Sequence, residues 1–154
     1  MRILVDADAC PVKEIIVRTA KRHGLPVTMV IDTSHELSDG YSEIITVDKA
    51  RDSADIRLIN LTKPGDIVVT QDFGVAALAL GKGARAIGQN GLVYSDANIE
   101  GLLLERHLGQ KIRRAGGRTA HMKKRTGEND AAFENAFERM LGDACAGGDS
   151  DAKK

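Results

Sequence analysis

The sequence predicts an α/β fold, in which a mainly parallel sheet lies between helices on both faces as three layers. Short apolar runs alternate along the chain with segments whose apolar residues recur at helical spacing. That alternation is typical of parallel strands joined by helical crossovers. Right-handed crossovers restrict the topology, and a strand order of about 3-2-1-4-5 satisfies them. In such a sheet, ligands bind at the carboxyl ends of the strands, where the strand order reverses.

Five short apolar runs are the expected strands, and most of them are rich in β-branched residues, which suit buried strands. In chain order they are Ile3–Val5, Val27–Ile31, Ile44–Val47, Ile67–Thr70 and Ala84–Ile87.

Helices are expected between and after these strands. The first runs from Pro11 to His23, because proline suits the first helical position and Gly24 ends the pattern. Polar residues that can cap a helix mark two of the others. The remaining helices are expected to include Ile56–Leu61 (capped by Asp52 or Ser53), Val75–Leu80, Ile99–Leu108 (capped by Asn98) and Asn129–Leu141.

Length and composition indicate one domain over residues 1–142, followed by a disordered tail of small, polar and charged residues over 143–154. The longest apolar stretch is far shorter than the roughly 20 residues of a membrane-spanning helix, so no membrane partner is expected. Cys10 and Cys145 are far apart, which favours reduced thiols and a cytoplasmic location. Cys10 could also be a nucleophile at a helix start, but a packed thiol is the simpler interpretation.

Four aspartates follow elements that the expected topology brings together. Asp6 and Asp8 follow the first strand, Asp72 follows the fourth, and Asp55 lies in the first turn of the middle helix. Strands one and four are neighbours in the expected order, so all four carboxylates face one crevice. Each one raises the cost of ionising the others, and Mg²⁺ or Mn²⁺ removes that cost. A bound ion can activate water for attack on a phosphodiester.

A structural interpretation of these acids stays open, because aspartate is common at helix caps and in turns. Taken alone, each of the four acids fits such a role. Asp52 is either a helix cap or a residue that reaches the ion through water. Three further acids, Asp32, Asp48 and Asp66, are expected to be loop or turn residues.

A basic run without any acid covers the segment from Lys111 to Arg125. It can contact the phosphates of RNA or DNA, or it can be a solvated loop. The net charge of the chain is zero, so such contacts depend on this local clustering. Lys13 could reach the crevice or be an ordinary surface lysine. The candidate nucleic-acid contacts are Arg113, Arg114, Arg118, Lys123, Lys124, Arg125 and Lys13.

Several segments together resemble the YaiI/YqxD family of bacterial proteins, over residues 1–141. They are residues 6–13 (DADACPVK), 52–55 (DSAD), 65–72 (GDIVVTQD), 80–84 (LGKGA) and 113–118 (RRAGGR). The resemblance implies a PIN-like fold related to metal-dependent ribonucleases. It also implies that Asp6, Asp55 and Asp72 correspond to the acids of that wider group. Residues 120–124 (AHMKK) stand where a Gly-Pro-Lys-like element is expected.

The function expected from these observations is that of a divalent-metal-dependent nuclease, acting on RNA rather than DNA. Asp6, Asp8, Asp55 and Asp72 would be both metal ligands and catalytic residues. One alternative is a haloacid-dehalogenase-type phosphatase with Asp6 as nucleophile and Asp8 as acid/base, although Ala9 and a helix starting at Pro11 argue against it. The other alternative is a non-catalytic, metal-stabilised RNA-binding module.

Overall fold

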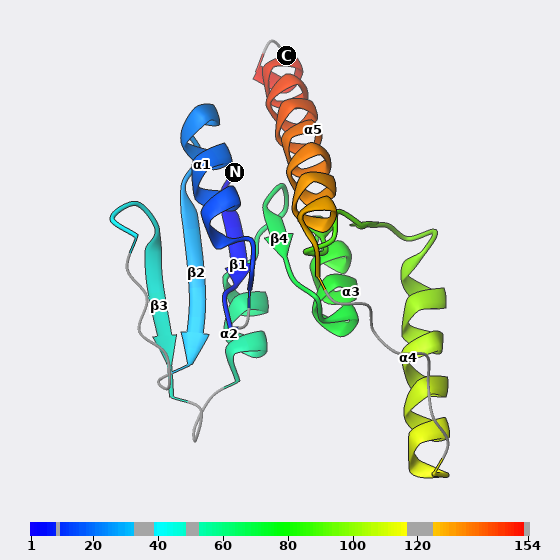
Figure 1. Cartoon of the computed structure of the whole chain (residues 1–154). Helices are drawn as coiled ribbons and strands as arrows, with labels where there is room; N and C mark the ends of the chain where they lie inside the picture. Colours follow the sequence, from blue (N-terminus) through cyan, green and yellow to red (C-terminus); the bar gives the residue numbers. More distant parts are fainter. Residues whose placement is uncertain (9, 33–38, 49–52, 117–124, 153–154) are drawn as a thin grey trace.

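The structure, a computed structural model, describes residues 1–8, 10–32, 39–48, 53–116 and 125–152. A six-stranded sheet in the order β3-β2-β1-β4-β5-β6 forms its centre (Figure 1). Every neighbouring pair is parallel except β5 and β6. The strands are β1 (Ile3–Asp6), β2 (Val27–Asp32), β3 (Glu43–Val47), β4 (Ile67–Val69), β5 (Arg85–Ile87) and β6 (Val93–Tyr94).

The expected fold class and strand order are confirmed, and β6 is an addition to them. Strand β1 lies at the centre of the order, between β2 and β4, because its first three residues pair with both neighbours. Strand β6 escaped the sequence analysis because it has only two residues. It pairs back on β5 after a turn in which Gly91 adopts a φ of 89°.

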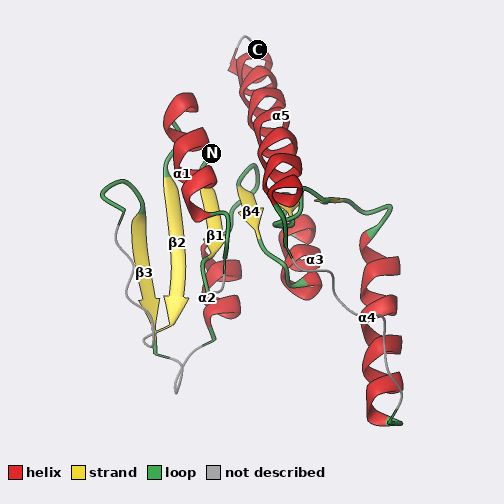
Figure 2. Ribbon diagram, in the orientation of Figure 1, coloured by secondary structure: helices red, strands yellow, loops and turns green. Residues whose placement is uncertain are grey.

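Helices cover both faces of the sheet, as Figure 2 shows. Helices α1 (Lys13–His23) and α5 (Gly127–Ala152) pack with Ile3 and Val5 on one face. Helices α2 (Ala54–Leu61), α3 (Phe73–Gly81) and α4 (Ile99–Arg114) contribute to the core around Leu4 on the other. Successive strand residues point to opposite faces, so β1 contributes to both cores.

Helix α1 begins at Lys13, so the expectation that Pro11 starts it is wrong. Pro11 and Val12 form a turn, and the Val12 carbonyl accepts the first helical hydrogen bond from the Ile16 N–H at 3.0 Å. Before this turn, the Ala7 N–H donates to the Val30 carbonyl of β2 at 3.1 Å, and the Cys10 N–H donates to the Ala7 carbonyl at 3.4 Å. A short connection therefore separates β1 from α1.

Two other helices run further than expected. Helix α4 continues past Leu108 to Arg114, through Gln, Lys and Arg residues that favour helix. Helix α5 continues past Leu141 to Ala152, into residues expected to be a disordered tail. The division of the chain at residue 142 stays a prediction. No helix in the described ranges is long and apolar enough to cross a membrane.

Candidate functional site

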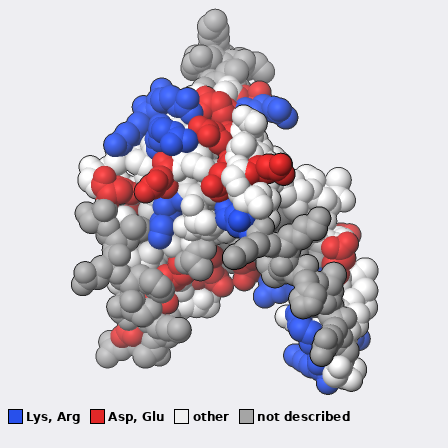
Figure 3. All heavy atoms as spheres, viewed as in Figure 1, with Lys and Arg blue, Asp and Glu red and all other residues white. Residues whose placement is uncertain are grey.

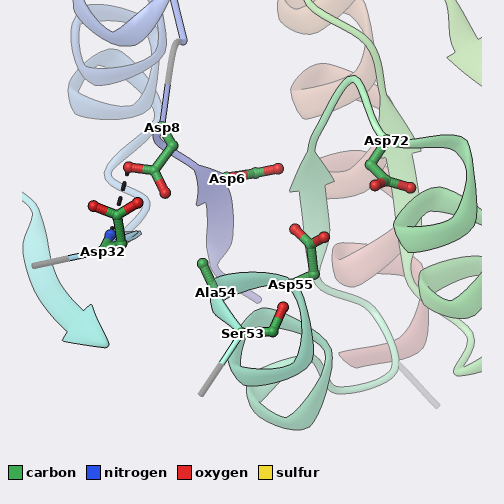
Figure 4. A pocket seen from close by; sticks show the side chains of 7 residues that line it. All are labelled: Asp6, Asp8, Asp32, Ser53, Ala54, Asp55 and Asp72. Carbon is green, nitrogen blue, oxygen red and sulfur yellow. Dashed lines mark hydrogen bonds between the residues drawn. The ribbon is translucent and has the colours of Figure 1, made fainter. Parts of the chain in front are cut away.

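A cavity of about 450 Å³ lies at the carboxyl edge of the sheet. Five carboxylates line it together with Ser53 and Ala54, and Figure 4 shows them around one space. Four of the five are the acids singled out from the sequence, and the fifth is Asp32. The carboxylates belong to Asp6, Asp8, Asp32, Asp55 and Asp72.

Three different kinds of chain position bring these carboxylates to one edge. Asp6 and Asp32 are the last residues of the parallel strands β1 and β2, and Asp8 follows β1 by two residues. Asp55 lies in the first turn of α2, and Asp72 is the N-cap of α3. The carboxyl ends of parallel strands and the starts of the helices that follow them meet at the same edge. The topology therefore decides the clustering.

Asp32 was expected to be a loop residue, and the structure places it in the cavity wall. Its backbone N–H lies 3.5 Å from Oδ1 of Asp8, which it donates to. The signal for it was present in the sequence, because Asp32 directly follows an apolar run in the same way as Asp6 does.

Asp72 is also a helix cap, the structural role that the sequence analysis left open for these aspartates. Its Oδ1 accepts hydrogen bonds from the N–H groups of Gly74 (2.8 Å) and Val75 (3.2 Å), which caps α3. The same oxygen lies 3.3 Å from a guanidinium nitrogen of Arg106 on α4. Among the described residues, all these partners use Oδ1, which leaves Oδ2 for the cavity.

Thr70, which the sequence analysis did not single out, links two of the acids. Its buried hydroxyl donates to Oδ2 of Asp6 at 3.4 Å and accepts from the backbone N–H of Asp72 at 3.0 Å. The hydroxyl of Tyr94 on β6 donates to the Thr70 carbonyl at 3.1 Å. A threonine at the end of a strand carries no pattern of its own, so this link appears only in three dimensions.

The crowded charges change the acidity of the cavity. Burial, followed by the charges of Asp55 and Asp8, raises the pKa of Asp6 to about 6, while the Thr70 hydrogen bond opposes the shift. Burial also raises the pKa of Asp55, with Asp72 and Asp8 adding to it and Arg106 opposing it. The cavity therefore disfavours full ionisation of its own carboxylates, and a cation would reverse this.

The donor chemistry suits a hard cation, but the side chains do not form a closed cage. In the described part of the chain, no three His, Cys, Asp or Glu residues form a group that could hold an ion by themselves. Mg²⁺ usually keeps several waters and uses one or two carboxylates, so a closed cage is not required. The residues fit an ion held by a few carboxylates and water. Asp52 lies outside the described residues.

The predicted phosphate-contacting residues are only partly placed. Arg113 and Arg114 lie at the exposed distal end of α4, and Lys13 begins α1. Arg125 forms an ion pair with Asp130 at 2.7 Å and donates a hydrogen bond to the Gln89 carbonyl at 2.9 Å. It therefore links the start of α5 to the turn that follows β5. Arg118, Lys123 and Lys124 lie outside the described residues.

Arg106 is the basic residue of α4 that the structure brings to the acids, and the sequence analysis missed it. It occurs within a helix pattern and before the basic run, so nothing in the sequence distinguished it. Cys10 is buried at 4% exposure, and burial raises the pKa of its thiol. A buried thiol that resists ionisation is a packing group rather than a nucleophile.

The fold and the cavity define a class: an α/β protein with a doubly wound, mainly parallel sheet and an acidic pocket at the carboxyl edge of its strands. The chain belongs to the family described as "Uncharacterized BCR, YaiI/YqxD family", whose model matches residues 4–143. This confirms the family resemblance drawn from the sequence.

Bacterial relatives share most of this chain. A "UPF0178 protein" of Ruminiclostridium cellulolyticum is 72% identical over 137 residues, covering 89% of this chain and 90% of that protein. Another, of Alkaliphilus oremlandii, is 58% identical over 134 residues, covering 87% and 86%. A crystal structure of a variant of Rae1 (YacP) from Bacillus subtilis matches with 18% identity, a TM-score of 0.43, and coverage of 96% and 99%. A likeness of that size supports no conclusion about activity.

Proposed function

We propose that this protein is a divalent-metal-dependent phosphodiester hydrolase that acts on nucleic acid, on RNA rather than DNA. The observation that carries the proposal is the cavity in which five carboxylates meet at the switch point of the sheet. The PIN-like fold that the family resemblance implies supports the same reaction class.

The proposed ligands of Mg²⁺ or Mn²⁺ are Asp6, Asp8, Asp55 and Asp72, with Asp52 reaching the ion through water. A bound ion would supply an activated water and neutralise charge on the leaving oxygen. The chain's own groups prepare the site for this. Thr70 holds the Asp6 carboxylate in place through the 3.4 Å hydrogen bond, and the α3 cap orients the carboxylate of Asp72.

The acidic cavity by itself repels a polyanionic substrate, so basic groups must offset its charge. Arg106 lies beside Asp72 and is 45% exposed, so it can contact a phosphate next to the cavity. The wider phosphate contacts of the proposal are Arg113, Arg114, Arg118, Lys123, Lys124, Arg125 and Lys13. Such contacts carry no sequence information, so they fit a substrate recognised through its backbone.

The test is cleavage of labelled single-stranded and structured RNA, and of matched DNA, in Mn²⁺ or Mg²⁺. Asp6→Asn and Asp55→Asn should each reduce the rate at least about a hundredfold, since each removes a charge that holds the ion. Asp66→Asn is the control, because Asp66 is a buried acid outside the cavity, and the rates are compared at a temperature where every variant is folded. Absence of cleavage by the wild type with either metal would overturn the proposal.

Two other outcomes correspond to the alternatives. Salt-sensitive RNA binding without turnover would identify a non-catalytic RNA-binding module. Binding of beryllium fluoride that depends on Asp6, together with hydrolysis of phosphomonoesters, would identify the haloacid-dehalogenase-type phosphatase. The later start of α1 removes one of the arguments against that phosphatase, while Ala9 remains against it.

A further inference from the structure

Helix α4 carries an apolar stripe that the body of the protein does not cover. Leu104, Leu108 and Ile112 follow one another at intervals of four residues and are 57%, 48% and 46% exposed. Residues at this spacing lie on one side of a helix. Figure 1 shows α4 projecting away from the sheet and from the other helices.

The projecting part of α4 has little to hold it in helical form. Only Ile99, at its first position, is buried, and Leu102 and Leu103 are partly buried against the core. Gly101 and Gly109 lie inside the helix and weaken it. Helical segments of this length are marginal in water unless an apolar face packs against something. The stripe is therefore the surface through which α4 would be stabilised.

Charge along α4 is divided between its two halves. Glu100 lies in the first turn, and Lys111, Arg113 and Arg114 lie in the last turn, with Glu105 and Arg106 between them. An antiparallel copy of the same helix would place acidic residues beside basic ones at both ends. Glu100, Lys111 and Arg114 also share one flank of the stripe, since they are spaced by eleven and then three residues.

We propose that the partner of this stripe is a second copy of the chain, and that two α4 helices pair antiparallel about a two-fold axis at Leu108. The pairing sets Leu108 against Leu108 and Leu104 against Ile112 of the other copy. Each Glu100 then lies beside Arg114 of the other copy. The same patch serves both subunits, as in an ordinary two-fold dimer.

The pairing leaves the acidic cavity accessible. Arg106, whose guanidinium is 3.3 Å from Asp72, follows Leu104 by two residues and precedes Leu108 by two. A two-residue step in a helix turns the side chain by about 200°, so Arg106 points away from the stripe. The stripe thus shares no residue with the cavity, so Leu108→Glu tests the dimer without altering the cavity carboxylates. Arg114 is also one of the proposed phosphate contacts.

Sedimentation velocity over a dilution series tests the proposal on the full chain. The wild type should be a dimer that dissociates on dilution, and Leu108→Glu should weaken it by at least about tenfold, because each dimer loses two central leucines. Ile56→Glu is the control, since Ile56 on α2 is 63% exposed and lies outside the stripe. A monomeric wild type at the highest attainable concentration would overturn the proposal, as would equal effects of the two substitutions.

Charge reversal tests the antiparallel direction. Glu100→Lys and Arg114→Glu should each weaken the dimer, and the two together should restore it, because the paired charges are exchanged. If the losses of dimer affinity in the two single variants added up in the double variant, the proposed pairing of Glu100 with Arg114 would be contradicted. RNA is the other candidate occupant, and a monomeric protein whose RNA affinity falls in Leu108→Glu would assign the stripe to RNA instead.

Cross-linking gives the register independently. In a Cys145→Ser background, which leaves only the buried Cys10, Leu108→Cys should be joined by a short bifunctional thiol reagent. Leu104→Cys should not, because its two copies would lie about 12 Å apart along the helix axis. A mixture of Leu104→Cys and Ile112→Cys chains should cross-link again. Equal cross-linking of all three single variants would indicate parallel helices and overturn the model.

Discussion

Helices α5 and α4 have similar amphipathic sequences but opposite surroundings. The apolar stripe of α5 is buried, with Phe133 and Phe137 fully covered and stacked at a ring distance of 5.1 Å. Polar residues of α5 form ion pairs with α1, such as that between Glu138 of α5 and Arg22 of α1 at 2.8 Å. The stripe of α4 is about half exposed at each of its three positions. The same kind of sequence pattern thus produces a core in one place and an uncovered surface in the other.

The difference extends to the parts of the fold around each helix. The α1–α5 layer combines buried apolar side chains with paired charges, as Figure 3 shows where blue and red side chains adjoin near the top of the molecule. The cavity and α4 instead hold crowded carboxylates and uncovered leucines. The apolar and charged groups of α1 and α5 therefore have partners within the fold, whereas the cavity carboxylates and the α4 leucines leave groups exposed to ligands and partners.

The largest expected effect is on the α5 side. Phe137→Ala should lower the free energy of unfolding by about 3–5 kcal/mol, because it removes a fully buried ring and leaves a cavity. Leu108→Ala on α4, measured in the same urea titration at concentrations where the chain is monomeric, should change it by less than about 0.5 kcal/mol. Similar losses for the two variants would contradict the division between the two layers.

On the cavity side, removing a charge should stabilise the protein. The pKa of Asp6 is about 6 in the folded chain against an ordinary value of 3.8, so the folded state holds this proton more tightly. That contribution is fully present below pH 4 and is lost as the pH rises through 6. Asp6→Asn should therefore raise the free energy of unfolding above pH 7 by on the order of 1–3 kcal/mol, with little change at pH 4.

Asp66→Asn is the control for this sign. Asp66 is buried and accepts hydrogen bonds from the N–H groups of Arg2 (3.2 Å) and Lys63 (2.9 Å). Its substitution should destabilise the fold at neutral pH, by about 1–3 kcal/mol, because a buried acceptor is lost. If Asp6→Asn lowered the free energy of unfolding at pH 8, the hydrogen bond from Thr70 to the Asp6 carboxylate would outweigh burial and the repulsion from neighbouring carboxylates.

A bound divalent cation should offset the repulsion among the cavity carboxylates and so stabilise the wild-type protein. At ten times its dissociation constant, Mn²⁺ should stabilise the wild type by about 1.4 kcal/mol, observed as a higher melting temperature at constant ionic strength. Asp6→Asn and Asp55→Asn should lose most of this shift, and Asp66→Asn should keep it. An equal shift in all the variants would place the ion outside the cavity.

The smallest expected effect concerns the ion pairs between α1 and α5. Glu138→Gln removes the negative charge that lies 2.8 Å from Arg22 and 2.6 Å from His23. Both partners are solvent-accessible, so the loss should be below about 1 kcal/mol and should disappear at high salt. A larger or salt-independent loss would mean that these pairs define the position of α5, and not the phenylalanine stripe.

Local patterns predicted most of the fold. Apolar runs located five strands, and crossover handedness arranged them in the observed order. Element ends were less certain, because they depend on hydrogen bonds to distant residues. The expected start of α1 at Pro11 was wrong, because Pro11 and Val12 form a turn and the first helical hydrogen bond is accepted at Val12.

The site was predicted in outline. Asp6, Asp8, Asp55 and Asp72 line one cavity, because strand ends in a parallel sheet share an edge. Asp32, Thr70 and Arg106 were missed. The parts of Thr70 and Arg106 come from contacts between elements that are far apart in the chain, and the sequence carries no sign of them. Asp32 follows an apolar run as Asp6 does, so the sequence did carry a signal for it.

The order of residues along the chain was enough to predict five of the six described strands, their order and four of the five cavity acids, because these follow from periodicity and chain connectivity. Only the tertiary structure decided which apolar stripe is covered, which carboxylate has a raised pKa, and which arginine reaches the cavity. Burial and charge interactions depend on distances in space, and these are set only when the whole chain has packed.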